Sequence, residues 1–470
     1  MRVYLYPLVM TLIKSISGIR GTIGGLPGDN LTPLDVVKFV SAFCAVHQEK
    51  FNRKDITIVM GRDARISGEM IATIAAHTIT GMGAHVIDLG LSTTPTVEMA
   101  VVHFKANAGI ILTASHNPAQ WNALKLLNEM GEFISAEVGQ KVLAWGEQGV
   151  AFAEVMHLGK IERKDSFDFH FDAILNMPLV NKPGIAQRKL KVVVDGINSS
   201  GSTFVPSILR ALGVEEIVVL NEEANGHFAH NPEPLAEHLI ETCARVKSEK
   251  ADLGIVVDPD VDRLAFIDEN GVLFGEEYTL VAIADYVLKH KKGNTVSNLS
   301  STRALRDVTE KHGGEYFAAA VGEVNVVEKM KAVNAVIGGE GNGGIIVPEL
   351  HYGRDAIVGI ALFLSHFVEM GITMSELKKT YPAYFMGKKK VDLDPSRPSD
   401  KILKALAEKY QNENINLIDG VKIDFPDYWV HLRRSNTEPI IRIYTEAATQ
   451  EIADQKAQDW IQEINDISFS

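Results

Sequence analysis

A strand–loop–helix–glycine–strand pattern of apolar and polar residues recurs three times along the chain. Each copy opens on a strand, passes through a polar or small-residue loop into a helix, and reaches glycine before a second strand; the third copy, whose opening strand is partly polar, is a plausible one. The opening strands are predicted at 56–60, 191–195 and 295–299, the helices at about 67–80, up to 211 and up to 312, and the closing strands from 84, at 217–220 and at 316–320. This order is typical of parallel strands covered by helices.

The C-terminal segment has a different pattern. It predicts a helix at 401–410, strands at 421–425, 429–432 and 440–444, and a last helix at 451–464. We therefore expect an α/β protein with three similar mixed-sheet domains and a smaller C-terminal α+β domain. The predicted boundaries are 1–165, 166–275, 276–385 and 386–470.

Composition narrows the class of protein. The chain has 470 residues, of which 46% are hydrophobic and 23% charged, and this balance excludes disorder as the main state. A formal charge of −13 argues against broad binding to nucleic acid or anionic membranes. Only Cys44 and Cys243 are present, so we expect a reducing, cytoplasmic setting.

Two apolar segments need a separate interpretation. Residues 1–13 lack the charged start and cleavage site of a secretory signal, and favour an initial strand or an extension before a natural start at Met10. The run 356–367 is too short and too polar to cross a bilayer and reads as a buried helix.

The first candidate for chemistry is the stretch Thr113-Ala114-Ser115-His116-Asn117-Pro118. It follows the apolar run 108–112, which predicts a buried strand, and Pro118 prevents a helix from starting there. A lone serine after a strand is most often part of a plain turn. The hydroxyl of Ser115 nevertheless stands on a loop fixed by a strand, where site residues tend to lie.

The second stretch places Asp258, Asp260 and Asp262 at alternate positions directly after the strand 253–257. Three such carboxylates repel one another and suit one hard cation with oxygen ligands, Mg²⁺ where phosphate is present. The alternative without a functional role is an acidic turn exposed to solvent. A helix–loop–helix calcium site fails, because Arg263 stands where that loop needs glycine and a strand precedes it.

The third stretch is the glycine-rich segment 338–344. Its spacing matches a dinucleotide-binding fingerprint, but the strand-like run 345–348 follows where that fingerprint needs a helix. A loop that allows close approach of a ligand fits better, with Glu340 and Asn342 as groups for sugar hydroxyls.

The fourth stretch lies between the last two predicted strands. It carries arginine, hydroxyl and amide groups that suit phosphate oxygens, at Arg433, Ser435, Asn436 and Thr437. Alone it is equally well a polar hairpin. Together, the four stretches provide a nucleophile, a cation site, groups that bind sugar hydroxyls and a phosphate-binding loop. Phosphoryl transfer needs this set of groups.

These four motifs, in this order and over nearly the whole chain, resemble the α-D-phosphohexomutase family, most closely its phosphoglucosamine mutases and phosphomannomutase/phosphoglucomutases. The resemblance implies four domains around a central cleft. It also implies interconversion of sugar 6-phosphate and sugar 1-phosphate through a phosphoserine enzyme and a bisphosphorylated sugar.

The resemblance implies a role for each motif residue. Ser115 would be the phosphoserine and would bind Mg²⁺ together with Asp258, Asp260 and Asp262. The segment 17–21 resembles the family's opening motif, which would put Arg20 beside the phosphoserine. Catalytic roles would also fall to His116, Lys125 and Arg263, with Lys125 near the transferred proton as an acid or base if its neighbours lower its pKa. Substrate would be held by Glu340, Asn342, Arg433, Ser435, Asn436 and Thr437.

Two positions depart from many bacterial relatives, which have histidine where this chain has Gly344 and serine where it has Asn342. Asparagine there resembles members acting on amino sugars, so glucosamine phosphate is the expected substrate, with mannose or glucose phosphate as the alternative. The implied partners are a phosphorylated hexose or hexosamine and an activating sugar 1,6-bisphosphate, with no nucleic acid or membrane. The implied assembly is a monomer or homodimer.

Overall fold

The computed structural model describes residues 10–15, 18–164, 168–394, 398–435 and 440–467. The chain divides into two compact units, which are treated separately below. The first comprises Met1–Glu276 and Gly344–Ser375, and the second comprises Glu277–Gly343 and Glu376–Ser470. Within the described part of the chain, no helix is both long and apolar enough to span a bilayer.

The first unit opens with a seven-stranded mixed sheet in the order β1-β2-β6-β5-β3-β4-β7. Its strands are β1 (Ile13–Ser15), β2 (Gly18–Thr22), β3 (Thr57–Arg62), β4 (His85–Leu91), β5 (Ala108–Leu112), β6 (Trp121–Leu127) and β7 (Ile161–Arg163). Strands β5, β3, β4 and β7 are parallel, whereas β6, β2 and β1 continue the sheet antiparallel.

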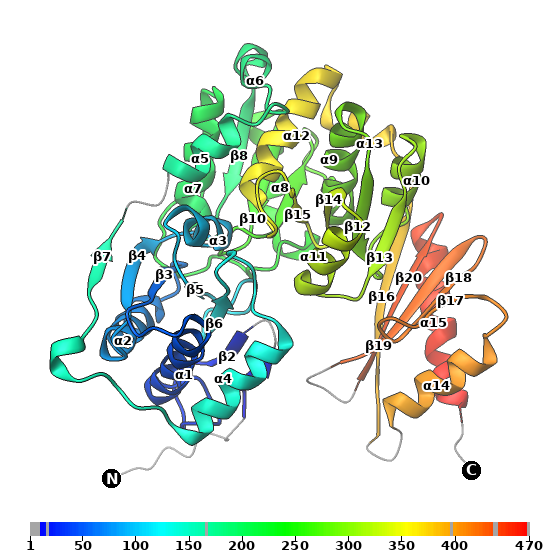
Figure 1. Cartoon of the computed structure of the whole chain (residues 1–470). Coiled ribbons are helices and arrows are strands. Elements are labelled where there is room, and N and C mark those ends of the chain that lie inside the picture. The colour runs from blue at the N-terminus through cyan, green and yellow to red at the C-terminus, as the bar shows by residue number, and fades with distance from the viewer. Residues whose placement is uncertain (1–9, 16–17, 165–167, 395–397, 436–439, 468–470) are drawn as a thin grey trace, which may run out of the picture. The chain divides into compact units, whose positions relative to one another are not determined.

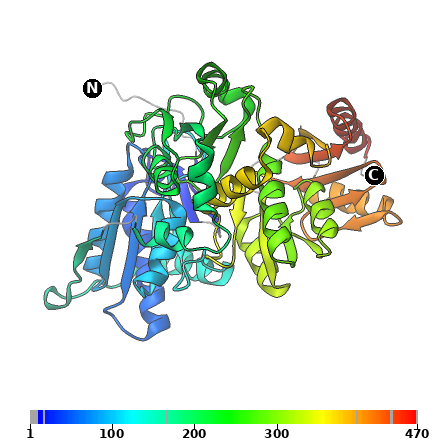
Figure 2. The same cartoon turned by 90° about the horizontal axis from the view of Figure 1, so that it is seen from above.

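Helices cover both faces of this sheet because alternate strand residues point to opposite faces. They are α1 (Pro33–Phe51), α2 (Gly68–Gly81), α3 (Thr94–His103) and α4 (Ala136–Gln148). Ile58 and Met60 belong to the core under α1, α2 and α4, whereas Val59 packs with α3 on the other face. Figure 2 shows these strands, in blue, between their helices.

The first unit also contains a four-stranded sheet in the order β11-β10-β8-β9. Its strands are β8 (Lys191–Asp195), β9 (Glu216–Leu220), β10 (Leu253–Val257) and β11 (Leu264–Ile267), with β11 alone antiparallel. Its helices are α5 (Asp168–Leu175), α6 (Lys182–Arg188), α7 (Gly201–Leu212) and α8 (Ile240–Glu249). The later segment of the first unit contains β15 (Gly344–Ile346) and α12 (Ala356–Met370).

Helix α12 binds this later segment to the rest of the first unit. It packs against α5, α6, α7 and β11 (Figure 1). The ring of Phe363 stacks on that of Phe266 in β11 at 3.8 Å. The residues just before α12 are therefore held against the loops of this unit, which matters for the site below.

The second unit has two sheets. Strands β13 (Tyr316–Ala319), β12 (Asn294–Asn298) and β14 (Ala335–Glu340) are parallel neighbours, and α9 (Glu276–His290), α10 (Ala304–Lys311), α11 (Glu323–Ala332) and α13 (Met374–Lys379) accompany them in the chain. The C-terminal sheet has the order β16-β20-β19-β18-β17 and is antiparallel. Its elements are β16 (Phe385–Asp392), α14 (Ser399–Lys409), β17 (Asn414–Asn416), β18 (Val421–Asp424), β19 (Tyr428–Arg434), β20 (Ile440–Ala447) and α15 (Gln450–Asp466).

The predicted strand–loop–helix–strand repeats agree with the structure to within a few residues in all three copies. The buried helix expected at 356–367 is α12, and every one of those residues is buried. The long strand β16 was not predicted, because its sequence carries three consecutive lysines and only two of its eight residues are buried. The expectations for residues 1–9 and for Ser17 lie outside the described residues.

Candidate active site

The loop that follows β5 holds Ser115 in an unusual conformation. Its φ of 49° lies in the left-handed region, which costs free energy for any residue other than glycine. The Ser115 amide donates a hydrogen bond to Thr113 Oγ1 at 3.0 Å, and Thr113 Oγ1 donates to Asp63 Oδ2 at 2.6 Å. These two hydrogen bonds hold the loop in place, and the backbone conformation of Ser115 sets the direction of its side chain.

The structure brings Ser115 next to the aspartate loop that follows β10. Ser115 Oγ donates to Asp258 Oδ2 at 2.6 Å. Asp258, Asp260 and Asp262 are all fully buried, and each offers an oxygen within 4.8 Å of the others. The backbone amides of Asp262 and Arg263 both donate to Asp258 Oδ1 at 3.1 Å, which holds the loop closed.

This carboxylate cluster fits a divalent cation. Asp260 Oδ1 and Asp262 Oδ1 are buried and accept no hydrogen bond from the described residues. Burial, and then the charges of Asp260 and Asp262, raise the pKa of Asp258 well above its ordinary value. Orphaned acceptors and mutual repulsion are both relieved by one hard cation, so the donor set suits Mg²⁺.

Lys125, on β6, also faces the cluster. Its Nζ lies 2.6 Å from Asp260 Oδ2 and 3.1 Å from Asp262 Oδ2. Burial alone would lower its pKa, but the two carboxylates outweigh burial and raise it. The raised pKa keeps Lys125 positively charged beside these carboxylates, and its acid–base role stays a prediction.

His116 lies beside Ser115. Its Nδ1 is 3.3 Å from Ser115 Oγ. Burial, and next the positive charges of Arg263, Arg354 and Arg20, hold its pKa well below the ordinary value. The imidazole is therefore neutral near pH 7 and is a weak proton acceptor.

Arg20 and Arg263 both have hydrogen-bonding capacity left for an anion. The Nε atoms of both are buried and have no hydrogen-bond partner among the described residues. Arg263 otherwise lies 3.7 Å from Glu233 through Nη1. Buried, unused guanidinium donors next to a serine hydroxyl are suited to phosphate oxygens.

Sequence reasoning did not identify Arg354, in the loop before α12. Its Nη2 donates to Asp262 Oδ2 at 2.7 Å, and the side chain is only 10% exposed. Asp262 is held ionised, with its pKa below the ordinary value, because Arg354, Lys125 and Arg263 together outweigh the effect of burial. Arg354 is far from the loop in sequence, so nothing short of the fold reveals it.

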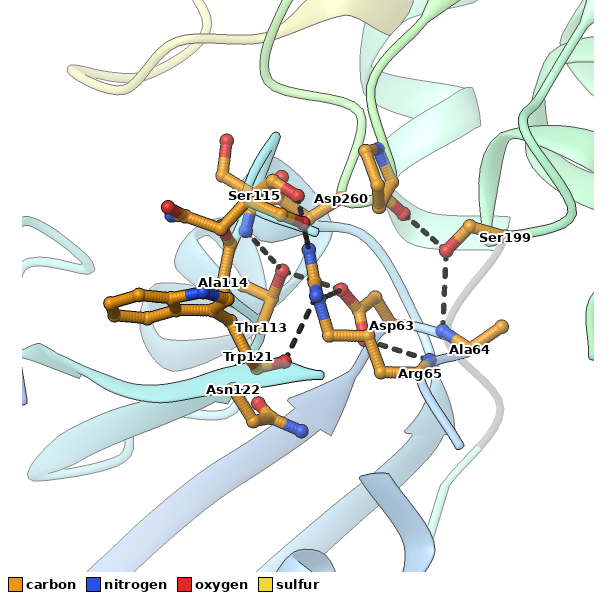
Figure 3. Close-up of polar contacts among 12 residues, drawn as sticks. Asp63, Ala64, Arg65, Thr113, Ala114, Ser115, Trp121, Asn122, Ser199 and Asp260 are labelled. Atoms are coloured by element: carbon orange, nitrogen blue, oxygen red, sulfur yellow. Dashed lines mark hydrogen bonds and ion pairs between the residues drawn. The ribbon is translucent and has the colours of Figure 1, made fainter. Parts of the chain in front are cut away.

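Sequence reasoning also missed Arg65, in the polar loop after β3. Its guanidinium donates to four backbone carbonyls of the serine loop, those of Ser115 and Asn117 at 2.6 Å, Pro118 at 2.7 Å and Trp121 at 2.9 Å. Its Nε donates to Asp63 Oδ2 at 3.0 Å (Figure 3). All these partners belong to the protein, so Arg65 holds the loop in shape. The only hint of Arg65 in the sequence was the run Arg-Asp-Ala-Arg at the edge of the same predicted sheet.

Two hydroxyl groups connect these loops to the aspartate loop. Ser199 Oγ accepts from the Ala64 amide at 3.3 Å and donates to the Pro259 carbonyl at 2.7 Å (Figure 3). Thr94 Oγ1, at the start of α3, donates to Asp260 Oδ2 at 2.5 Å. Three separate loops of the first unit are therefore joined around Ser115 and Asp258.

The glycine-rich loop and the arginine loop belong to the second unit. Glu340 is 4% exposed, and its Oε1 accepts from Asn298 Nδ2 at 2.9 Å and from the Gly322 amide at 3.0 Å. Asn342 is partly exposed. A Cβ at Gly341 would lie 2.1 Å from Glu277 Oε2, which explains the need for glycine there.

Arg433 stands at the end of β19, and its Nε lies 3.2 Å from Asp419 Oδ2. Asp419 Oδ2 also accepts from the Val321 amide at 3.0 Å, next to Gly322, which contacts Glu340. Ser435 is half-buried and donates its amide to the Ile440 carbonyl at 3.1 Å. Asn436 and Thr437 lie outside the described residues.

Comparison with known proteins agrees with this geometry. Phosphoglucomutase/phosphomannomutase family models match four consecutive regions: alpha/beta/alpha domain I at 12–148, domain II at 168–271, domain III at 275–384 and the C-terminal domain at 390–462. These matches confirm the predicted four-domain α/β architecture; the exact domain boundaries stay a prediction.

Three relatives illustrate the similarity. A phosphoglucomutase/phosphomannomutase of Thermococcus kodakarensis is 35% identical over 453 residues, covering 94% of this chain and 96% of that protein. A phosphoglucosamine/phosphogalactosamine mutase of Sulfurisphaera tokodaii is 32% identical over 445 residues, covering 93% and 95%. A crystal structure of a phosphoglucomutase/phosphomannomutase family protein from Burkholderia thailandensis has the same fold, with a TM-score of 0.83, 24% identity, and 97% and 96% coverage.

The four domains and the buried serine–carboxylate site together define an isomerase that works by phosphoryl transfer. The chain belongs to the phosphoglucomutase/phosphomannomutase family, and it is a phosphosugar mutase. The predicted family and enzyme class are thereby confirmed.

Proposed function

We propose that this mutase carries its phosphoryl group on Ser115 and converts glucosamine 6-phosphate to glucosamine 1-phosphate. The observation that carries the assignment of Ser115 is its 2.6 Å hydrogen bond to Asp258 inside a buried triple-aspartate loop. The aspartates of this loop form a candidate cation site, and Arg20 and Arg263 have buried Nε donors that no described residue uses. This is the combination that phosphoryl transfer requires.

In the first step, the bond between phosphorus and Ser115 Oγ breaks while a bond from phosphorus to a sugar hydroxyl oxygen forms, and the proton lost by that hydroxyl balances the one gained by Ser115 Oγ. The sugar becomes a 1,6-bisphosphate. In the second step, the other phosphorus–sugar oxygen bond breaks while a bond from that phosphorus to Ser115 Oγ forms, and the proton lost by Ser115 balances the one gained by the sugar oxygen, which leaves the isomer. Mg²⁺ bound by Asp258, Asp260 and Asp262 would supply positive charge to the transferring group.

The chain's own residues hold charge and protons around that transfer. Arg20 and Arg263 bind the phosphoryl oxygens through donors that no described protein group uses. Lys125 remains charged and keeps Asp260 and Asp262 in place. His116 Nδ1, 3.3 Å from Ser115 Oγ, is placed to form a hydrogen bond with the serine hydroxyl that the first step produces.

Recognition of the sugar is assigned to the second unit. Glu340 and Asn342 read hydroxyl or amino groups, and Arg433 with Ser435, Asn436 and Thr437 binds the phosphate that is not reacting. An asparagine at 342 favours the amino sugar; conversion of mannose or glucose phosphates is the second candidate, supported by the 35% identical relative. We also propose a cytoplasmic enzyme, monomeric or homodimeric, primed by a sugar 1,6-bisphosphate.

The test is intact-mass analysis followed by coupled assays. The purified enzyme, incubated with glucose 1,6-bisphosphate, should gain one phosphate, and peptide mapping should place it on Ser115. Ser115→Ala should gain none and lose turnover by several orders of magnitude, whereas Ser248→Ala, at an exposed helix position, should behave as wild type. Full turnover by Ser115→Ala would falsify the assignment. Parallel assays with glucosamine, mannose and glucose 1-phosphates decide between the substrates.

A further inference from the structure

A second cluster of metal-ligating side chains lies in the first unit, apart from the aspartate loop. It consists of His170 on α5, His351 in the loop before α12, and Asp355 at the start of α12. Asp355 Oδ2 lies 2.9 Å from His170 Nε2 and 3.2 Å from His351 Nε2. All three donor atoms lie within 4.8 Å of one another.

The other ring nitrogen of each histidine is held by a separate partner. His170 Nδ1 lies 2.9 Å from Thr96 Oγ1, and His351 Nδ1 lies 3.5 Å from Glu98 Oε2, both partners being on α3. Metal-binding histidines have this arrangement, in which the second nitrogen is tied to a hydroxyl or carboxylate that fixes the ring and its tautomer. Both Nε2 atoms are thereby turned toward the same oxygen.

Local packing keeps the Glu98 carboxylate in this cluster. A Cβ at Gly353 would lie 1.9 Å from Glu98 Oε2 and 2.9 Å from the His351 ring, so glycine is required for the approach. His170 and Asp355 are fully buried, and the His351 side chain is 13% exposed. The cluster is enclosed except along the edge of His351.

Both ring nitrogens of His351 face carboxylates, with Nε2 3.2 Å from Asp355 Oδ2 and Nδ1 3.5 Å from Glu98 Oε2. A neutral imidazole has one N–H and therefore donates to only one of the two. A cation bound at Nε2 leaves that N–H on Nδ1 for Glu98.

We propose that His170 Nε2, His351 Nε2 and Asp355 Oδ2 form a binding site for a divalent transition metal of the Zn²⁺ type. Two imidazoles and one carboxylate suit zinc, cobalt or nickel and do not suit magnesium, which prefers oxygen ligands. Three protein ligands leave a fourth position for water, on the side where His351 reaches the surface.

This site connects to the aspartate loop through the residue before Asp355 and through α3, whose Thr96 and Glu98 contact the two histidines. Arg354, the neighbour of Asp355, donates to Asp262 at 2.7 Å. Helix α3 carries Thr96 and Glu98, and at its first residue Thr94 donates to Asp260 at 2.5 Å. A metal that ties α5, α3 and the start of α12 together therefore also fixes two supports of the aspartate loop.

The test measures Zn²⁺ binding by the full-length protein, stripped with chelator and kept in excess Mg²⁺ so that the aspartate loop is occupied by its hard cation. Calorimetry should detect one tight Zn²⁺ site per chain, and the affinity of that site should fall at least tenfold in His351→Gln and in His170→Gln. His157→Gln, which removes an exposed histidine, should bind as wild type. The zinc absorption edge should show two imidazole ligands, with Zn–N distances of about 2.0–2.1 Å.

A rescue variant separates ligation from a folding defect. His351→Cys offers a thiolate at the same position, so it should bind Zn²⁺ again and give a sulfur–cobalt charge-transfer band with Co²⁺ that wild type lacks. Wild type that takes up no Zn²⁺ beside Mg²⁺, an edge spectrum without imidazole, or unchanged binding by both His→Gln variants would each overturn the proposal. Absence of Zn²⁺ binding with normal mutase turnover would identify the cluster as a hydrogen-bonded structural group that holds no metal.

Discussion

At the residue scale, the site depends on backbone geometry that residue types do not disclose. The types at 113–118 identified Ser115 as a nucleophile candidate, and the alternation of aspartates identified the cation loop. Ser115 has a left-handed φ, and its carbonyl accepts a hydrogen bond from Arg65, which lies 50 positions earlier in the chain. No local pattern encodes such a contact, because it exists only once β3 and β5 are neighbours.

Arg65→Lys tests this support. A lysine keeps the charge but has one nitrogen in place of the fork that reaches four carbonyls and Asp63. Turnover should fall about 100-fold, because a displacement near 1 Å at the reacting atom has that effect. KM should change little, since Arg65 contacts only protein atoms. Arg53→Lys, at an exposed pair with Asp55, is the matched control and should keep full turnover.

The raised pKa of Asp258 predicts a pH-dependent response to Mg²⁺. A carboxyl group whose pKa is higher in the folded than in the unfolded state binds extra protons when folded, so its stabilising effect is lost as pH rises through the folded pKa. Mg²⁺ binds the ionised loop and reverses that loss. The rise in Tm on adding Mg²⁺ should therefore be larger at about pH 8 than at about pH 5.

Thermal melts at both pH values, with and without Mg²⁺, measure this difference. In Asp258→Asn position 258 no longer titrates, so the Mg²⁺ effect should become small and nearly independent of pH. An equal Mg²⁺ shift for wild type at both pH values would show that Asp258 is already ionised in the metal-free protein.

At the element scale, the sequence predicted strands and helices wherever one face is buried, and it failed where burial is sparse. The strands β3 and β8 contain continuous apolar runs, and β12, although mostly polar in type, is largely buried, so each repeat has a strand with a buried face. Strand β16 has no such run and is mostly exposed, and its place in the sheet is set by pairing with β20 along its whole length. Pairing of that kind is a tertiary property.

Helix α3 shows how one element links the fold to the chemistry. Thr93 caps the helix by accepting from the Thr96 amide, and Thr94 is thereby turned to Asp260. Thr94→Val keeps the shape and removes the hydroxyl. Mg²⁺ affinity or turnover should fall about 10–100-fold, the usual effect of losing a partner of a metal ligand. Titration of activity with Mg²⁺ measures both, and Thr73→Val on the exposed face of α2 serves as control. A Mg²⁺ titration curve identical to wild type would rule out this role for Thr94.

At the scale of the whole molecule, the four motifs separate by unit. Ser115 and the three aspartates lie in the first unit, whereas Glu340, Asn342 and Arg433 lie in the second. The four motifs and their order were enough to predict the family by resemblance. They were not enough to predict the contacts of Arg354, which returns to the first unit from a segment beyond residue 343.

This separation predicts two distinct classes of variant. Substitution in the first unit, as in Thr94→Val, should lower turnover by the same factor for every sugar phosphate. Asn342→Ser in the second unit should leave phosphorylation of Ser115 unchanged and alter the ratio of kcat/KM between glucosamine and glucose 1-phosphates by about 10–100-fold, the value of one polar contact to a distinguishing substituent. Intact mass and the paired coupled assays measure the two effects in one preparation. If Asn342→Ser slows turnover of all sugar phosphates equally, the Asn342 side chain contributes to phosphoryl transfer itself. Recognition of the sugar would then be assigned to Glu340, whose carboxylate accepts hydrogen bonds from Asn298 and the Gly322 amide.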